Sequence, residues 1–180
     1  MLWLFVVIPA LAIAWAVWTF NRLVRLRNQV RTAWADIDVQ LSRRHDLVPN
    51  LVAAVQAYAS HERALLENVA TLRAQALGLR SPQRLGEVES RLEQGLARLL
   101  ALQEAYPDLK ANRNFAQLQD DLVKVEDTLQ YARRFYNGAV RDFDDGLQKF
   151  PDVLVAQAFG FVAAEFYRAD ADAHGAPRVG

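Results

Sequence analysis

The sequence contains no cysteine, and only three of its 180 residues are histidine. The absence of cysteine excludes disulfide bonds, thiolate zinc sites and cysteine nucleophiles together. His45 and His61 are sixteen positions apart, roughly 24 Å along one helix, so they share a metal only if another segment supplies further ligands. We therefore predict neither a metal site nor a cofactor.

Signatures of catalysis and of nucleotide binding are also missing. No glycine-rich phosphate loop, nucleophile elbow or Ser–His–Asp order is present. The acidic run that starts at Asp142 resembles a calcium loop, but Gly146 comes one place early and Val153 stands where the loop needs glutamate. Basic residues form no stripe interleaved with aromatics, so nucleic acid is excluded as a partner. We predict that the protein is not an enzyme and has no catalytic residues.

The longest uncharged run is Leu2–Phe20, at the N-terminus. As a helix it would span roughly 28 Å, close to the thickness of a bilayer core. Trp3 lies near one end of the run, and Trp15 and Trp18 lie near the other, as in the aromatic belts of membrane proteins. A cleaved signal peptide is the alternative, but no basic segment precedes the run. We predict an uncleaved transmembrane anchor over residues 1–21.

Four arginines follow this run directly: Arg22, Arg25, Arg27 and Arg31. No side-chain charge precedes the run, so the positive-inside rule places the N-terminus outside and the rest of the chain in the cytoplasm. The same arginines are suited to contact anionic lipid headgroups, at about 1 kcal/mol each. We interpret them first as a topology signal, with which headgroup contact is compatible.

Apolar residues recur three or four positions apart through the next part of the chain, which is a helical period. They are Val30, Trp34, Ile37, Leu41, Val48, Val55, Tyr58, Leu65, Val69, Leu72 and Ala76. The stripe predicts one helix from about Arg22 to about Leu77, kinked near Pro49 because proline removes a backbone hydrogen bond. Two helices are the alternative, the second capped by Asp46 with Pro49 in its first turn.

Three further helices are predicted, over about 82–105, 112–148 and 152–167. The last is apolar nearly all round, so we expect it to be buried, although it is too short to span a bilayer. Residues 169–180 are expected to be disordered. The predicted fold is all-α: a single N-terminal transmembrane helix, then an elongated antiparallel up-and-down helical bundle over residues 22–168. The bundle has three long helices plus a short C-terminal helix, with seams like those of a coiled coil.

A charge cluster interrupts the apolar stripe of the first helix at Arg43, Arg44, His45 and Asp46. One interpretation is a local salt-bridged cap, in which Asp46 pairs with the arginines and Asn50 bonds the backbone groups that the proline frees. The other is a docking site for a partner protein or a second copy. Both interpretations remain open at this stage.

Three long motifs make the chain recognisable. They are AWADIDVQLSRRHDLVPNLVAAVQAYASHE at 33–62, EAYPDLKANRNFAQLQDDLVKVED at 104–127 and ARRFYNGAVRDFDDGLQKFP at 132–151. Together with the N-terminal run, they resemble the LemA family from Leu2 to Phe166. Of the motif positions, Arg43, Arg44, Glu126, Arg133 and Asn137 have no evident need in packing.

The resemblance implies a bacterial inner-membrane protein with one N-terminal span and a helical bundle, in a family without an established activity or cofactor. A relative in magnetosome-forming bacteria is tied to membrane remodelling. Others are associated with membrane-embedded metalloproteases and envelope stress. On this basis we expect the bilayer and other membrane proteins, such as a metalloprotease, as partners.

The predicted function is a membrane-anchored scaffold or adaptor that mediates protein–protein interaction and contributes to membrane organisation or envelope-stress functions. The predicted interaction patch consists of Arg43, Arg44, Asp46, Asn50, Glu126, Arg133 and Asn137. One alternative is a membrane-face enzyme with a polar pocket near Arg44, His45, Glu126 and Arg133. Another is a homo-oligomeric structural protein, because the apolar seams resemble coiled-coil surfaces.

Overall fold

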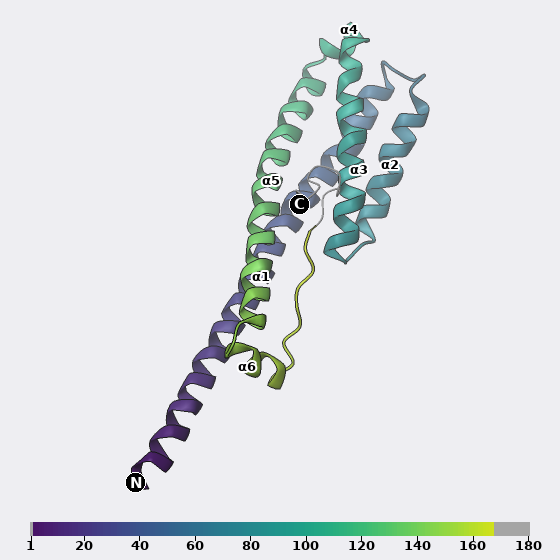
Figure 1. The fold of residues 1–180 in the computed structure, drawn as a ribbon. Helices are drawn as coiled ribbons and strands as arrows, with labels where there is room; N and C mark the ends of the chain where they lie inside the picture. The colour runs from purple at the N-terminus through teal and green to yellow at the C-terminus, as the bar shows by residue number, and fades with distance from the viewer. Residues whose placement is uncertain (1, 168–180) are drawn as a thin grey trace, which may run out of the picture. The chain divides into compact units, whose positions relative to one another are not determined.

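The computed structural model describes residues 2–167, and within that range every regular element is helical. The elements are α1 (Leu2–Gln56), α2 (Arg63–Leu77), α3 (Pro82–Ala101), the 3₁₀ helix η1 (Leu102–Glu104), α4 (Pro107–Lys110), α5 (Arg113–Gln148) and α6 (Asp152–Ala158) (Figure 1). The all-α prediction is confirmed for these residues. The predicted disordered tail, 169–180, lies outside the described residues.

The chain forms two compact units, and α1 and α5 each contribute to both. Unit 1 contains the chain up to Asp36 together with Arg134–Ala164. Unit 2 contains Ile37–Arg133 and, of the described residues that follow, Glu165–Tyr167. These units are groups of contacting residues, and the predicted domain boundaries at residues 21 and 168 stay predictions.

The core of unit 2 is built from α1, α2, α3, α4 and α5. Its buried residues are Val48, Leu51, Val55, Ala59, Leu66, Val69, Leu72, Leu92, Leu96, Leu99, Leu109, Phe115 and Leu122. Helices α2 and α3 approach closely at Gly95, where an added Cβ would lie 3.0 Å from Cγ2 of Val69. The apolar side of each helix thus faces a common core, as expected for amphipathic helices.

Unit 1 packs the middle of α1 against the second part of α5. Leu23 and Ala33 of α1 are fully buried, as is Val140 of α5. The rings of Trp34 and Tyr136 lie 5.3 Å apart, centroid to centroid. The helix predicted over about 112–148 is confirmed as α5, and its buried apolar residues recur along its whole length, from Phe115 to Leu147.

The prediction of one helix from Arg22 to Leu77 is wrong, and so is its alternative of a second helix starting near Asp46. Helix α1 continues through Pro49 to Gln56, and residues 57–62 form a turn before α2. This turn contains neither glycine nor proline, so the sequence does not mark it. The turn shifts the apolar phase, because Tyr58 is 41% exposed and Ala59 is fully buried.

Pro49 is accommodated inside α1 by a side chain from another helix. Proline has no backbone N–H, so the carbonyl of His45, four residues earlier, lacks its helical donor. Nε of Arg73, on α2, donates a hydrogen bond to that carbonyl at 2.7 Å. Asn50 was expected to bond the backbone groups that Pro49 frees. Arg73 makes this bond instead, and it thereby links α2 to α1.

The predicted last helix is also too long, since α6 ends at Ala158 rather than near residue 167. Gly160 has a φ of 65°, which favours glycine. The N–H of Phe161 bonds the carbonyl of Ala156 at 3.0 Å, and the N–H of Gly160 bonds that of Gln157 at 3.3 Å. This pair of bonds is a Schellman motif, which ends α6 after two turns.

A double-mutant cycle tests the role of Arg73. Arg73→Met leaves the partly buried carbonyl of His45 without a donor, so we expect the free energy of unfolding to fall by about 1–3 kcal/mol. In a Pro49→Ala background, residue 49 supplies the helical N–H again, and the same substitution should cost less. Urea unfolding of the four full-length proteins in detergent measures the coupling. An equal cost in both backgrounds would contradict this role.

Candidate functional site: a buried charge network and an amide-lined groove

Arg44, on α1, is a fully buried charge in unit 2. Its Nη1 lies 3.2 Å from Oε2 of Glu89, on α3, and its Nη2 lies 2.9 Å from Oε2 of Glu126, on α5. Glu89 is fully buried as well. A buried charge is costly unless an opposite charge compensates it, so these contacts determine which parts of the three helices face each other.

His45 adds a second contact between α1 and α3. Its Nε2 is hydrogen-bonded to Oε1 of Glu89 at 2.6 Å. Nη1 of Arg44 also donates to the backbone carbonyl of Glu89, at 3.4 Å. Adjacent residues of α1 therefore hold both the side chain and the backbone of Glu89.

Arg133, on α5, extends the network away from Glu89. Its Nη1 lies 3.2 Å from Oε2 of Glu93 and 3.5 Å from Oε1 of Glu126. Its guanidinium lies 5.3 Å from the ring centroid of Tyr167, within the range of a cation–π interaction. We call Arg44, His45, Glu89, Glu93, Glu126 and Arg133 the buried charge network, in which Glu93, with its side chain 39% exposed, forms the solvent-facing end.

Burial shifts the ionisation of several groups here. Burial raises the pKa of Glu126 above its ordinary value, a trend that Arg44 and Arg133 oppose and Glu93 reinforces. Burial also raises the pKa of Tyr167 to about 12. For Arg133, burial alone would lower the pKa, but the charges of Tyr167, Glu126 and Glu93 outweigh it and raise the pKa.

The structure divides the predicted interaction patch. Its exposed members on α1 are Arg43, Asp46 and Asn50. Arg44, Glu126 and Arg133 belong to the buried charge network. Asn137 is half-buried and belongs to unit 1. The expectation that Arg44, Glu126 and Arg133 are not needed for packing is wrong, while a docking role for the exposed members stays a prediction.

Glu89 and Glu93 were missed as site residues. A signal for Glu89 was present, because it falls in the helical spacing of Leu85, Leu92 and Leu96, where an apolar residue is expected. A charge at a core position calls for a partner, which Arg44 supplies. Glu93 carries no comparable signal, since it lies one position beyond that stripe.

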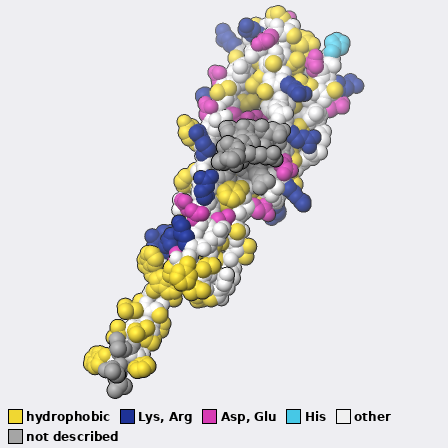
Figure 2. Space-filling view, viewed as in Figure 1, with side chains coloured by type: hydrophobic (Ala, Val, Ile, Leu, Met, Phe, Trp, Pro, Cys, Tyr) yellow, Lys and Arg dark blue, Asp and Glu magenta, His cyan; other side chains and the backbone are white. Residues whose placement is uncertain are grey.

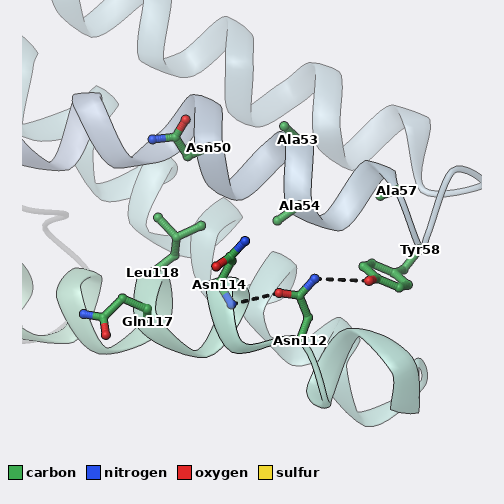
Figure 3. Close-up of a pocket in the computed structure, with 9 residues that line it drawn as sticks. All are labelled: Asn50, Ala53, Ala54, Ala57, Tyr58, Asn112, Asn114, Gln117 and Leu118. Carbon is green, nitrogen blue, oxygen red and sulfur yellow. Dashed lines mark hydrogen bonds between the residues drawn. The ribbon is translucent and has the colours of Figure 1, made fainter.

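An open groove of about 550 Å³ lies in unit 2 between the end of α1 and the start of α5 (Figure 3). Its lining residues are Asn50, Ala53, Ala54, Ala57, Tyr58, Asn112, Asn114, Gln117 and Leu118. Asn112 shapes one side, since its Nδ2 donates to the Tyr58 hydroxyl at 3.1 Å. Its Oδ1 accepts from the N–H of Asn114 at 2.8 Å, which caps α5 (Figure 3). We call this cavity the amide groove.

The amide groove has a distinct chemistry. Among the described residues, no aspartate, glutamate, lysine or arginine lines it. Asparagine and glutamine side chains carry both donors and acceptors, as the main chain of a peptide does. The three alanines have short side chains on the α1 side of the groove, so a bound peptide chain can approach the backbone of that helix. Asn50 is the member of the predicted patch that lines this groove.

A smaller cavity of about 210 Å³ adjoins the buried charge network. It is lined by Glu93, Leu96, Ala97, Leu100, Leu122, Val123 and Glu126. The enzyme alternative predicts a polar pocket, whereas this cavity has a mainly apolar wall that includes neither Arg44 nor His45. That alternative stays a prediction. Among residues 2–167, no group of three or more His, Cys, Asp or Glu side chains is placed to hold a metal ion.

The four arginines after the apolar run occupy different surroundings in unit 1. Arg22 pairs with Asp152, and its guanidinium lies 5.9 Å from the ring centroid of Trp18. The guanidinium of Arg27 lies 5.3 Å from the ring centroid of Phe161. Arg25 and Arg31 are exposed. Their roles in topology and in headgroup contact stay predictions.

One helix in the described part of the chain, α1, is long and apolar enough to cross a membrane. Only 11% of its apolar window is buried inside the protein, whereas the core helix of a soluble protein is mostly buried. This criterion rests on length and composition alone.

The sequence model of the LemA family matches residues 33–180. The chain belongs to the LemA family. It is 22% identical to magnetosome protein MamQ 2 of Paramagnetospirillum magneticum, over 83% of this chain and 64% of the relative. It is 20% identical to magnetosome protein MamQ of Magnetospirillum gryphiswaldense, over 82% and 64%. It is also 25% identical to protein LemA of Metamycoplasma hominis, over 84% and 73%. The chain thus spans just under two thirds of the length of the magnetosome relatives.

Replacing Arg44 tests the buried charge network, and the adjacent Arg43 provides a matched control. Arg44→Met leaves Glu89 buried without its main cation, so we expect a loss of about 3–5 kcal/mol in the free energy of unfolding. Arg43→Met changes an exposed position and should stay within about 0.5 kcal/mol of the wild type. Urea unfolding of the full-length proteins in detergent compares them. Similar losses for both variants would count against the network.

The raised pKa of Glu126 predicts a pH dependence of stability. The folded state binds the Glu126 proton more tightly than the unfolded state does, so this residue favours folding most at low pH. Its contribution declines as the pH rises from the unfolded-state pKa through the raised folded-state pKa. The stability of Glu126→Gln relative to the wild type should therefore increase with pH over this window. Denaturant unfolding at pH 4 to 8 measures the difference, and a decrease would contradict the assignment.

Proposed function

We propose that the protein is a membrane-anchored helical scaffold or adaptor, in which α1 supplies the anchor and unit 2 supplies a partner-binding surface. The anchor is supported by the exposure of apolar residues in the first part of α1. They are Trp3, Phe5, Val6, Val7, Ile8, Leu11, Ile13, Val17 and Trp18. A continuous apolar surface of this kind is costly in water and suited to a bilayer.

The topology belongs to the same proposal. Arg22, Arg25, Arg27 and Arg31 support a single span with the N-terminus outside and the remaining helices in the cytoplasm of a bacterial inner membrane. An antiparallel up-and-down bundle is the proposed arrangement of those helices. It is consistent with the shared core of α1, α2, α3 and α5 in unit 2.

The amide groove is the observation that carries the adaptor role. It is an open cavity of about 550 Å³, and none of its lining residues within 2–167 is charged, which suits an extended, uncharged segment of a partner protein. The side chains of Asn50, Asn114 and Gln117 supply the donors and acceptors that the main chain of such a segment needs. Peptide recognition commonly combines main-chain hydrogen bonds with shallow side-chain sites.

The proposed partners are expectations from the family resemblance. A role in membrane organisation is one of them, and the relatives include magnetosome proteins. Envelope-stress functions, with a membrane metalloprotease as the partner, are the other expectation from the family resemblance. A homo-oligomer is the alternative in which the groove binds a second copy of the chain.

Photo-cross-linking in the native membrane tests the adaptor role. A photoreactive residue at Asn114 should capture a defined membrane protein, whereas one at the exposed Tyr131, outside the groove, should not. Ala54→Arg fills the groove and should abolish capture, while Ala74→Arg, at an exposed position of α2, should leave it unchanged. Equal capture from both positions would refute the groove. Capture of a second copy would instead support the homo-oligomer.

A further inference from the structure

The segment 150–162, which includes α6, exposes large apolar side chains to solvent. Phe150 is 81% exposed, Leu154 55%, Phe159 62% and Val162 79%. The last helix predicted, over about 152–167, was expected to be buried, and for Leu154, Phe159 and Val162 that is wrong. Val155 and Ala156 do pack inside the protein. The segment therefore has one buried side and one apolar side that nothing in the described structure covers.

Specific contacts attach this segment to the end of the apolar run of α1, within unit 1. The buried carboxylate of Asp152 accepts a hydrogen bond from the hydroxyl of Thr19 at 3.3 Å and pairs with Arg22. Phe20 packs against two rings of the segment, with centroid distances of 4.8 Å to Phe159 and 5.7 Å to Phe161. The segment is thus held level with residues 19–22 of α1.

The position of the segment favours a lipid bilayer, rather than a protein partner, as the cover of its apolar side. Apolar side chains are exposed along α1 as far as Trp18, one residue before the contact with Asp152. A bilayer that covers this surface up to Trp18 ends where the segment is attached. Figure 2 shows hydrophobic side chains along the N-terminal part of the molecule, with Lys and Arg side chains close to them. The exposed Phe159 of the segment contacts Phe20, two residues after Trp18, so the segment adjoins the apolar run of α1.

The charges beside the segment fit a membrane surface. Arg25 is exposed, and the guanidinium of Arg27 lies 5.3 Å from the ring centroid of Phe161. Arg22 compensates Asp152, so the segment carries no uncompensated acid at this attachment. Aromatic and aliphatic side chains next to arginines are typical of elements that lie in the headgroup region of anionic bilayers.

We propose that residues 150–162 form an interfacial membrane-binding element. Phe150, Leu154, Phe159 and Val162 insert into the headgroup and upper acyl region of the same leaflet that α1 leaves. The element supports α1 where it emerges from the bilayer, because Asp152 and Phe159 hold it to Thr19, Arg22 and Phe20. This proposal rests on the proposed anchor, so its test must report on the anchor separately.

The absence of cysteine allows a direct test with single labels. Phe150→Cys, Leu154→Cys and Val162→Cys, each in the full-length protein, are labelled with an environment-sensitive nitrobenzoxadiazole dye. The proteins are reconstituted in phosphatidylcholine–phosphatidylglycerol vesicles that contain lipids spin-labelled near the headgroup or deep in the acyl chain. We expect blue-shifted emission that the shallow spin label quenches about twofold or more, and more strongly than the deep one.

Two control positions lie in the same unit. Phe135→Cys replaces an exposed phenylalanine of α5, thirteen residues before the end of that helix and roughly 20 Å away along it. A dye at Phe135 should show water-like emission without quenching. Ile8→Cys reports on the anchor, and the deep spin label should quench its dye more strongly. Circular dichroism confirms that each labelled protein keeps its helical content.

The outcomes separate the two proposals. If the dye at Ile8 is quenched and the dyes at Phe150, Leu154 and Val162 behave like the one at Phe135, the interfacial element is refuted and the anchor stands. If Ile8 is not quenched, both proposals fail. If the three dyes emit as in an apolar environment but no lipid spin label quenches them, a protein covers this side, which also refutes the interfacial element.

Discussion

The buried ion pair of Arg44 and Glu89 is the constraint on which unit 2 depends. Both side chains are fully buried, so each would be an uncompensated charge without the other. An apolar seam between helices tolerates a shift of one turn, because one leucine can replace another as a neighbour. A buried pair tolerates no such shift. The contact of Arg44 with Glu126 extends the same constraint from α3 to α5.

A second constraint acts one helical turn later on α1. Pro49 frees the carbonyl of His45, and Arg73 supplies the missing donor from α2. The side chain of the same histidine bonds Glu89 on α3. One residue of α1 is therefore held by two different helices, through its backbone and through its ring. These bonds set the position of the last turns of α1, which form one wall of the amide groove.

The sequence predicts most of the helices because their ends carry chemical signals. Gly78 follows the last residue of α2, and Pro82 is the first residue of α3. Pro107 begins α4, the short helix that precedes α5. The turn at residues 57–62 carries no such signal, since packing of Ala59 rather than turn chemistry sets it. The sequence also could not predict which residues pair with Arg44. Periodicity shows that a charge lies at a core position, but it does not show which helix supplies the opposite charge.

The α6 segment shows a different limit. Its composition indicates apolar surroundings, but composition cannot tell a protein interior from a lipid interface, since both are apolar. The decision between them depends on neighbours. Asp152 bonds Thr19 and Arg22, and Phe159 packs on Phe20, so the exposed side of the segment adjoins the apolar run of α1. These contacts are the reason why we propose a membrane surface, rather than a protein core, as the environment of this segment.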